Sequence, residues 1–194
     1  MEMLTGTWNN VDTVRSARYT CGHCGNSIAS EKAFFTKTTG GNPVTCIYIC
    51  HICNRPSLLE SGRQIPGAKF GEDIRALPND IAGLYEEARN CASANAYTAA
   101  VLCCRKLLMN IAVSKGALPN LSFIAYVEYL SNAGYVPPDG KNWVDHIRTK
   151  GNEATHEISI MNKADAYDLI TFIGMLLKFI FEFPSKIKSR TSSA

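Results

Sequence analysis

Two Cys-x-x-Cys pairs constrain the fold of this chain more than any other feature of its sequence. The first pair is Cys21 and Cys24, the second is Cys50 and Cys53, and 25 residues separate the two pairs. Zn²⁺ prefers four soft ligands in a tetrahedron, and each pair presents two thiolates from one tight turn. The spacing therefore predicts one structural Zn²⁺ per chain, held by four thiolates with no coordination position left open for catalysis.

Paired cysteines have two other common uses, a redox motif and disulfide bonds. A turn signal at residues 39–43 between two β-like segments predicts a hairpin between the pairs, and this arrangement favours metal over both alternatives. Gly25 and Asn54, which follow the second cysteine of each pair, are types that tolerate the left-handed backbone such turns need. His23 and His51 are expected to be bystanders because four thiolates complete the shell. The remaining cysteines are expected to act as small buried apolar residues; they are Cys46, Cys91, Cys103 and Cys104.

The pattern of the chain changes after its first third. Residues 1–60 are rich in β-branched and aromatic residues and predict a small β zinc ribbon, and residues 61–77 read as a Gly- and Pro-punctuated linker. Residues 78–183 predict an all-α bundle of about five helices, and residues 184–194 a basic flexible tail. The helices are expected at about 79–94, 96–115, 122–132, 142–155 and 163–183. The expected fold class is α+β, mainly α.

The charge of the chain is nearly balanced, with 20 Lys and Arg against 17 Asp and Glu. This composition argues against a globally basic nucleic-acid binder, although a local basic face or a generic solvated surface both fit the ribbon. The residues concerned are Arg15, Arg18, Lys32, Lys37 and Arg55. The N-terminus has no signal-peptide pattern, and the most apolar stretch, residues 169–183, is too short for a membrane span. We expect a cytoplasmic protein with reduced cysteines and no membrane partner.

The expected fourth helix carries a polar stripe of Arg148, Asn152 and His156, spaced i, i+4, i+8. Such a row can engage a phosphodiester, with Arg stabilising charge and His moving a proton. The alternative is a structural role, in which the His156 imidazole forms a hydrogen bond with a neighbouring helix and Arg148 forms an ion pair with an acid. Arg105, in the apolar second helix, needs an ion-pair partner or a phosphate. The candidate partners are Glu86, Glu87 and Glu157.

The segments LPNDIAGLYEEARNCASANAYTAAVLCCRKLLMNIA and IRTKGNEATHE resemble a bacterial family, domain of unknown function 4145, over about residues 70–180. The motifs that carry the resemblance are LPxDI, a helix pair with EA and AxxxxR, and GNxxxHE. It implies a HEPN-like helical bundle that commonly forms a homodimer, with relatives in bacterial and phage defence. HEPN ribonucleases use an Arg, a polar residue and a His without metal, so His156 and Asn152 would be the proton-transfer residue and its companion, with Arg148 one turn earlier.

Two classes of function follow. The primary prediction is a non-catalytic module that binds nucleic acid (RNA or DNA) or protein through its zinc ribbon. The alternative is a metal-independent endoribonuclease in which His156 activates a ribose 2′-hydroxyl and Arg148 stabilises the transition state. Seven residues separate Arg148 from His156, more than in the ribonuclease pattern, which favours the binding module. A nucleotide-sensing domain is a weaker third option.

Overall fold

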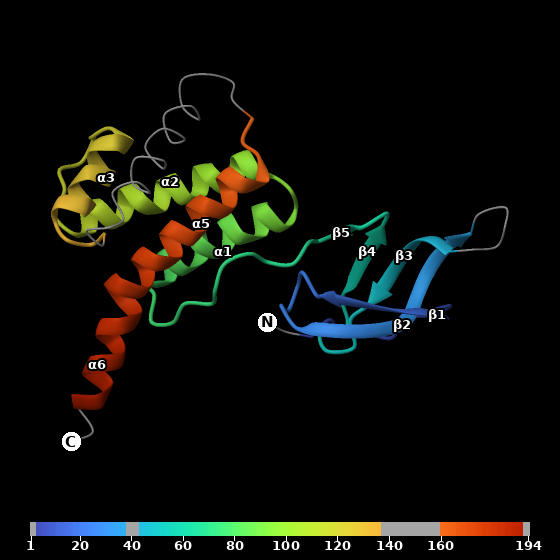
Figure 1. The fold of residues 1–194 in the computed structure, drawn as a ribbon. Coiled ribbons are helices and arrows are strands. Elements are labelled where there is room, and N and C mark those ends of the chain that lie inside the picture. Colours follow the sequence, from blue (N-terminus) through green and yellow to red (C-terminus); the bar gives the residue numbers. More distant parts are fainter. Residues whose placement is uncertain (1–2, 38–42, 137–159, 192–194) are drawn as a thin grey trace. The chain divides into compact units, whose positions relative to one another are not determined.

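The computed structural model describes residues 3–37, 43–136 and 160–191. The chain divides into two compact units, residues 1–69 and residues 70–194. The first unit contains all the described strands and the second all the described helices (Figure 1). Each unit has its own buried apolar core.

The first unit, here called the sheet unit, is a five-stranded antiparallel meander in the order β1-β2-β3-β4-β5 (Figure 1). Its strands are β1 (Asp12–Thr20), β2 (Ser27–Lys37), β3 (Pro43–Ile49), β4 (Pro56–Glu60) and β5 (Arg63–Ile65). The β1–β2 connection holds the first cysteine pair and the β3–β4 connection holds the second. Because alternate turns of a meander lie at the same end of the sheet, both pairs meet at one end.

The prediction of a small N-terminal zinc ribbon is wrong, because the sheet has five strands and is larger than a ribbon. Strand β1 was missed because it is an edge strand with charged residues, in which only Tyr19 is fully buried. It also has an irregular register: Thr13 pairs with Lys32 but Ala17 pairs with Ser30, so β1 bulges between them. Strand β5 is only three residues long and leaves no periodic signal.

The second unit, here called the helical unit, has four continuous helices among its described residues (Figure 1). They are α1 (Asn79–Ser93), α2 (Tyr97–Ser114), α3 (Phe123–Asn132), and a last helix formed by α5 (Lys163–Leu177), a π-helical turn (Lys178–Glu182) and α6 (Phe183–Thr191). This is roughly compatible with the expected five, and the expected helix at 142–155 lies outside the described residues.

Helix α2 is the centre of the helical unit and packs against α1, α3 and α5. It is apolar on most sides, and eight of its residues are buried. By length and composition it is also the one described helix that could cross a membrane. Its neighbours explain that apolarity, because the inner helix of a bundle is apolar all round.

The helix boundaries follow local signals. Ser122 caps α3 by accepting a hydrogen bond from the amide of Ala125 at 3.2 Å, and Asn162 forms a capping box with Asp165 at the start of α5. Gly116 follows α2 with a φ of +102°, a left-handed backbone that is common where a helix ends.

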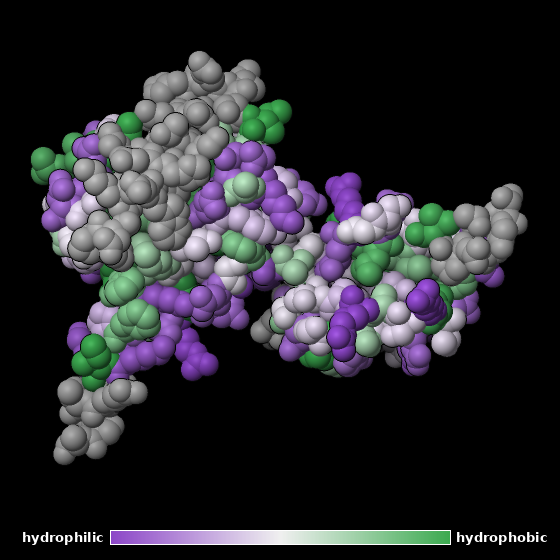
Figure 2. All heavy atoms as spheres, in the orientation of Figure 1, coloured by the Kyte–Doolittle hydropathy of each residue, from purple (hydrophilic) through white to green (hydrophobic). Residues whose placement is uncertain are grey.

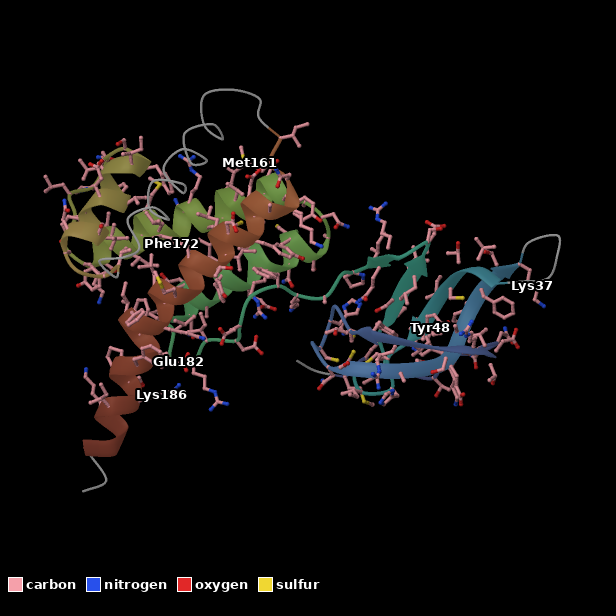
Figure 3. The ribbon with its side chains drawn as sticks, in the orientation of Figure 1. Lys37, Tyr48, Met161, Phe172, Glu182 and Lys186 are labelled. Carbon is pink, nitrogen blue, oxygen red and sulfur yellow. The ribbon has the colours of Figure 1, made fainter. Side chains whose placement is uncertain are left out.

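The last helix continues past Pro184, where the sequence predicts its end. Pro184 lies in the first turn of α6, directly after the π-helical turn, so its missing N–H interrupts few helical hydrogen bonds. Glu182 is buried there and accepts hydrogen bonds from the ammonium of Lys186 and the amide of Arg75 (Figure 3). The Lys186 ammonium is the main reason why the pKa of Glu182 is lowered.

This helix also exposes an apolar stripe of Phe179, Phe183 and Ile187, visible as green side chains near its end in Figure 2.

Arg89 on α1 fastens the chain that enters the helical unit. Its side chain is 8% exposed, and it donates hydrogen bonds to the carbonyls of Phe70 and Gly71, both at 3.0 Å. It also forms ion pairs with Asp73 at 2.6 Å and Glu86 at 3.2 Å. Because the guanidinium binds main-chain carbonyls as well as carboxylates, it fixes the path of residues 70–73.

Candidate metal centre

The structure brings the four cysteines of the two pairs together. Their Sγ atoms all lie within 4.8 Å of one another. Two contacts cross between the pairs, at 3.7 Å from Cys21 to Cys53 and 3.8 Å from Cys24 to Cys50. All four are free thiols, so the structure has no disulfide here.

These distances fit a tetrahedral metal ion. With metal–sulfur bonds of about 2.3 Å, the sulfur–sulfur edges of a tetrahedron are about 3.8 Å. The two contacts between the pairs match this edge. Cys21 and Cys50 have no exposed surface, and Cys53 is 4% exposed, so an ion held here would be shielded from water on most sides. The four cysteines could therefore hold a metal ion.

The two cysteine turns have the same backbone design. In the first, Gly25 N–H donates to the Cys21 carbonyl at 2.8 Å, and in the second, Asn54 N–H donates to the Cys50 carbonyl at 2.8 Å. Gly25 has a φ of +73° and Asn54 a φ of +58°. The predicted left-handed backbone at both positions is confirmed.

The thiols have unequal pKa values. Burial raises the pKa of Cys21 and of Cys53. Burial also acts to raise the pKa of Cys24, but hydrogen bonds, chiefly from the side chain and amide of Asn26, outweigh it and lower the value to about 7. Buried thiols that must ionise to bind a metal make binding release protons.

Asn54 has a role that its place after Cys53 does not suggest. Its side-chain amide donates to the carbonyls of Leu4 and Gly6, both at 2.9 Å, while its own carbonyl accepts from the indole N–H of Trp8 at 3.0 Å. The Leu4 amide also donates to the Cys53 carbonyl at 3.0 Å. The second cysteine turn thus holds the N-terminal arm, residues 3–11, against the sheet unit.

Two buried residues in the described part of the sheet unit carry hydroxyls without a partner. Tyr19 is 7% exposed and Ser57 has no exposed surface, and neither hydroxyl oxygen has a hydrogen-bond partner among the described residues. Burial, followed by the negative charge of Cys50, raises the pKa of Tyr19. A buried hydroxyl without a hydrogen-bond partner destabilises the folded state by about 1–3 kcal/mol, so we expect each of these hydroxyls to have an acceptor.

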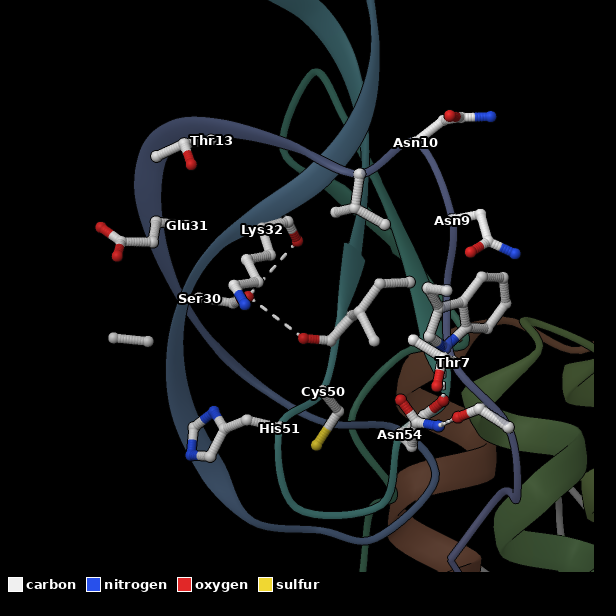
Figure 4. Close-up of a pocket in the computed structure, with 15 residues that line it drawn as sticks. Thr7, Asn9, Asn10, Thr13, Ser30, Glu31, Lys32, Cys50, His51 and Asn54 are labelled. Carbon is white, nitrogen blue, oxygen red and sulfur yellow. Dashed lines mark hydrogen bonds between the residues drawn. The ribbon is translucent and has the colours of Figure 1, made fainter.

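A cavity of about 700 Å³ adjoins the second cysteine turn (Figure 4). The N-terminal arm, β2 and the turn itself form its walls. Trp8 from the arm, Lys32 from β2 and His51 from the turn contribute the largest aromatic and basic side chains. Its floor is fixed by Ser30, whose hydroxyl donates to the Ile49 carbonyl at 3.1 Å.

Cys46 and Cys104 are buried as expected, whereas Cys91 and Cys103 are only half-buried. His23 forms a hydrogen bond through Nε2 with the carbonyl of Pro56 at 3.0 Å. Cys46 is buried in the core of the sheet unit and Cys104 in that of the helical unit, against which Cys91 and Cys103 pack. None of these side chains belongs to the four-sulfur cluster.

The remaining predicted residues do not form a site in the described part of the chain. Arg148, Asn152 and His156 lie outside the described residues. Arg105 is 7% exposed, and its guanidinium lies 4.3 Å from the centre of the Phe123 ring. Over the described ranges it makes no ion pair with Glu86 or Glu87, and its Nη1 has no hydrogen-bond partner. The basic residues of the predicted ribbon face are exposed except Arg55, which is half-buried.

Comparison with known proteins gives one match. No curated protein and no solved structure matches the chain. Residues 86–193, which lie in the helical unit, match the family described as "Domain of unknown function (DUF4145)". The match covers more than half of the sequence, and the chain therefore belongs to this family.

Proposed function

We propose that Cys21, Cys24, Cys50 and Cys53 hold a structural Zn²⁺, and that the zinc-stabilised sheet unit is a nucleic-acid-binding module. The sulfur–sulfur distances of 3.7 and 3.8 Å carry the first part. Four soft thiolates select zinc over the oxygen-preferring cations, and they fill its tetrahedral shell. With no open position, the ion would organise the two cysteine turns and take no part in a reaction.

The charge distribution supports a nucleic-acid partner. Residues 1–69 contain seven Lys and Arg against four Asp and Glu, whereas residues 70–194 contain thirteen of each. The net charge of +3 is therefore confined to the sheet unit. Arg15, Arg18 and Lys32 are exposed there, and exposed cations on one unit attract the phosphate backbone.

The cavity beside the second cysteine turn is the proposed binding position. Its volume of about 700 Å³ is in the usual range of ligand sites. Trp8 is half-buried in its wall and supported by Phe34, with 6.1 Å between the ring centres. An aromatic ring with a neighbouring lysine suits a stacked base and its phosphate. Zinc would act indirectly, because the turn that it fixes also holds Trp8 through Asn54.

The test is fluorescence anisotropy of the full chain with labelled single- and double-stranded RNA and DNA at several salt concentrations. Lys32→Ala should weaken binding several-fold and reduce the salt slope by about 1. Lys37→Ala is the matched control, because Lys37 is on the same strand but does not line the cavity (Figure 3). It should bind like the wild type.

Each other outcome decides against the proposal in a different way. Failure of all four nucleic acids to bind would contradict it and favour a protein partner. Equal losses for Lys32→Ala and Lys37→Ala would move the binding position away from the cavity. RNA cleavage by the wild type without added metal, and its loss in His156→Ala, would favour the ribonuclease.

A further inference from the structure

Tyr19 and Ser57 place two hydroxyl groups inside the sheet unit without an obvious use. In the part of the chain that the structure describes, neither hydroxyl has a hydrogen-bond partner. Tyr48 provides the contrast, since it lies 6.0 Å from Tyr19, ring centre to ring centre, and is also buried. Its hydroxyl donates to the Arg15 carbonyl at 2.9 Å. The lack of a hydrogen-bond partner at Tyr19 and Ser57 is therefore not shared by every buried hydroxyl of this core.

The strand register places both residues on the face of the sheet that carries Cys21 and Cys50. Tyr19 precedes Cys21 by two residues, so strand alternation directs both side chains to one face. Ser57 on β4 pairs directly with Tyr48 on β3, and Tyr48 precedes Cys50 by two residues. Tyr19, Cys21 and Cys50 belong to the same cluster of buried residues.

The charges of the cysteines act on the Tyr19 hydroxyl, which agrees with its place on their face of the sheet. Among the cysteines, Cys50 has the largest effect on Tyr19, ahead of Cys21 and Cys53. Ser57 also interacts with the Tyr19 hydroxyl, although the pair does not reach hydrogen-bond geometry.

Phenylalanine and alanine would fill these positions without an unpaired hydroxyl. A centre with four thiolates and a divalent cation carries a net charge of −2, and hydrogen bonds from neighbouring groups stabilise such charge and orient the ligands. We propose that, when the four cysteines hold a divalent metal, Tyr19 donates a hydrogen bond to a thiolate of this cluster and Ser57 donates one to the Tyr19 oxygen. Both are positioning residues, and the inference rests on the proposed metal centre.

Cobalt(II) is the probe for this inference, because its sulfur-to-metal charge-transfer band reports the energy of the thiolate lone pairs. The band is recorded for the full-length wild type, Tyr19→Phe, Ser57→Ala and Tyr48→Phe, and the affinity of each for cobalt is measured by competition with a chelator. Loss of a hydrogen bond raises the lone-pair energy. Tyr19→Phe should therefore move the band to lower energy and weaken cobalt binding by about 10-fold or more.

The two other variants define the source of the effect. Ser57→Ala should shift the band in the same direction by a smaller amount, because it acts through Tyr19. Tyr48→Phe removes a buried hydroxyl from the same face, but one that already donates to Arg15. Its band energy and affinity should equal those of the wild type.

The outcomes separate this inference from the metal centre itself. A wild type that takes up no cobalt, or shows no thiolate-to-cobalt band, contradicts the metal centre and the inference with it. If the wild type binds cobalt normally and Tyr19→Phe has the same band energy and the same affinity, the inference is overturned but the metal centre stands. If Tyr19→Phe does not fold, Ser57→Ala decides, and an unchanged band in that variant overturns the inference.

Discussion

Gly22 in the first cysteine turn should not tolerate an added methyl group. A Cβ added there would lie 2.4 Å from the Gly67 carbonyl oxygen, 2.5 Å from the Pro66 oxygen and 2.8 Å from the Pro66 carbonyl carbon. These are all main-chain atoms, so no side-chain rotation relieves the clash. An ordinary contact of about 3.4 Å requires the segments to separate by about 1 Å.

That movement would break a second contact. The side-chain amide of Gln64 donates to the Pro66 carbonyl and to the Thr20 carbonyl, both at 2.8 Å, and so ties this segment to the end of β1. Overpacking costs about 1–3 kcal/mol, and a lost hydrogen bond adds about 1 kcal/mol. We expect Gly22→Ala to lower the free energy of unfolding by about 2–4 kcal/mol.

The assay is urea unfolding of the sheet unit, followed through Trp8 in a Trp143→Phe background. His51→Ala is the matched control, because His51 occupies the same place in the second cysteine turn and is exposed. It should change the free energy of unfolding by less than about 0.5 kcal/mol. Equal stability of Gly22→Ala and the wild type would refute the close approach of residues 66–67 to the first turn.

Three further predictions concern contacts elsewhere in the chain. Arg89→Ala should destabilise the helical unit by about 2–4 kcal/mol in thermal unfolding, since two carbonyls lose a charged donor, whereas Arg75→Ala, at an exposed site, should have little effect. The pKa of Glu182 is lowered from 4.5, so its carboxylate stabilises the folded state fully above that pH. This contribution to the free energy of unfolding is lost as the pH falls through the lowered pKa. When the free energy of unfolding is measured at a series of pH values, Glu182→Gln should remove this loss of stability at acid pH. An unchanged acid dependence in the variant would contradict the role given to Glu182. Asn54→Gly keeps the left-handed backbone but removes two hydrogen bonds, so amide exchange in residues 3–8 should accelerate while the sheet stays protected.

Local sequence signals predict the parts of this structure that depend on neighbouring residues. Each cysteine turn is closed within six residues by its own backbone, and Gly25 and Asn54 are apt types for the φ values observed there. The starts of α3 and α5 likewise lie at Ser122 and Asn162, whose side chains cap the helix in their own first turn. These features need no knowledge of the fold.

The features that the sequence does not predict depend on residues far apart in the chain. Strand β1 has an exposed, charged pattern that becomes a strand only by pairing with β2. In the sequence Arg89 looks like any arginine on a helix surface, and its role depends on the hydrogen bond that it donates to the distant Phe70 carbonyl. Tyr19 and Ser57 are 38 positions apart, and only the sheet register places both on the face that carries Cys21 and Cys50.

Zinc content per chain tests the central claim most directly. Freshly purified, reduced full-length protein should contain one zinc ion per chain, Cys50→Ser should lose it, and Cys46→Ser, on the strand that precedes Cys50, should retain it. Little or no zinc in the wild type, or full zinc in Cys50→Ser, would contradict a metal centre formed by the four cysteines.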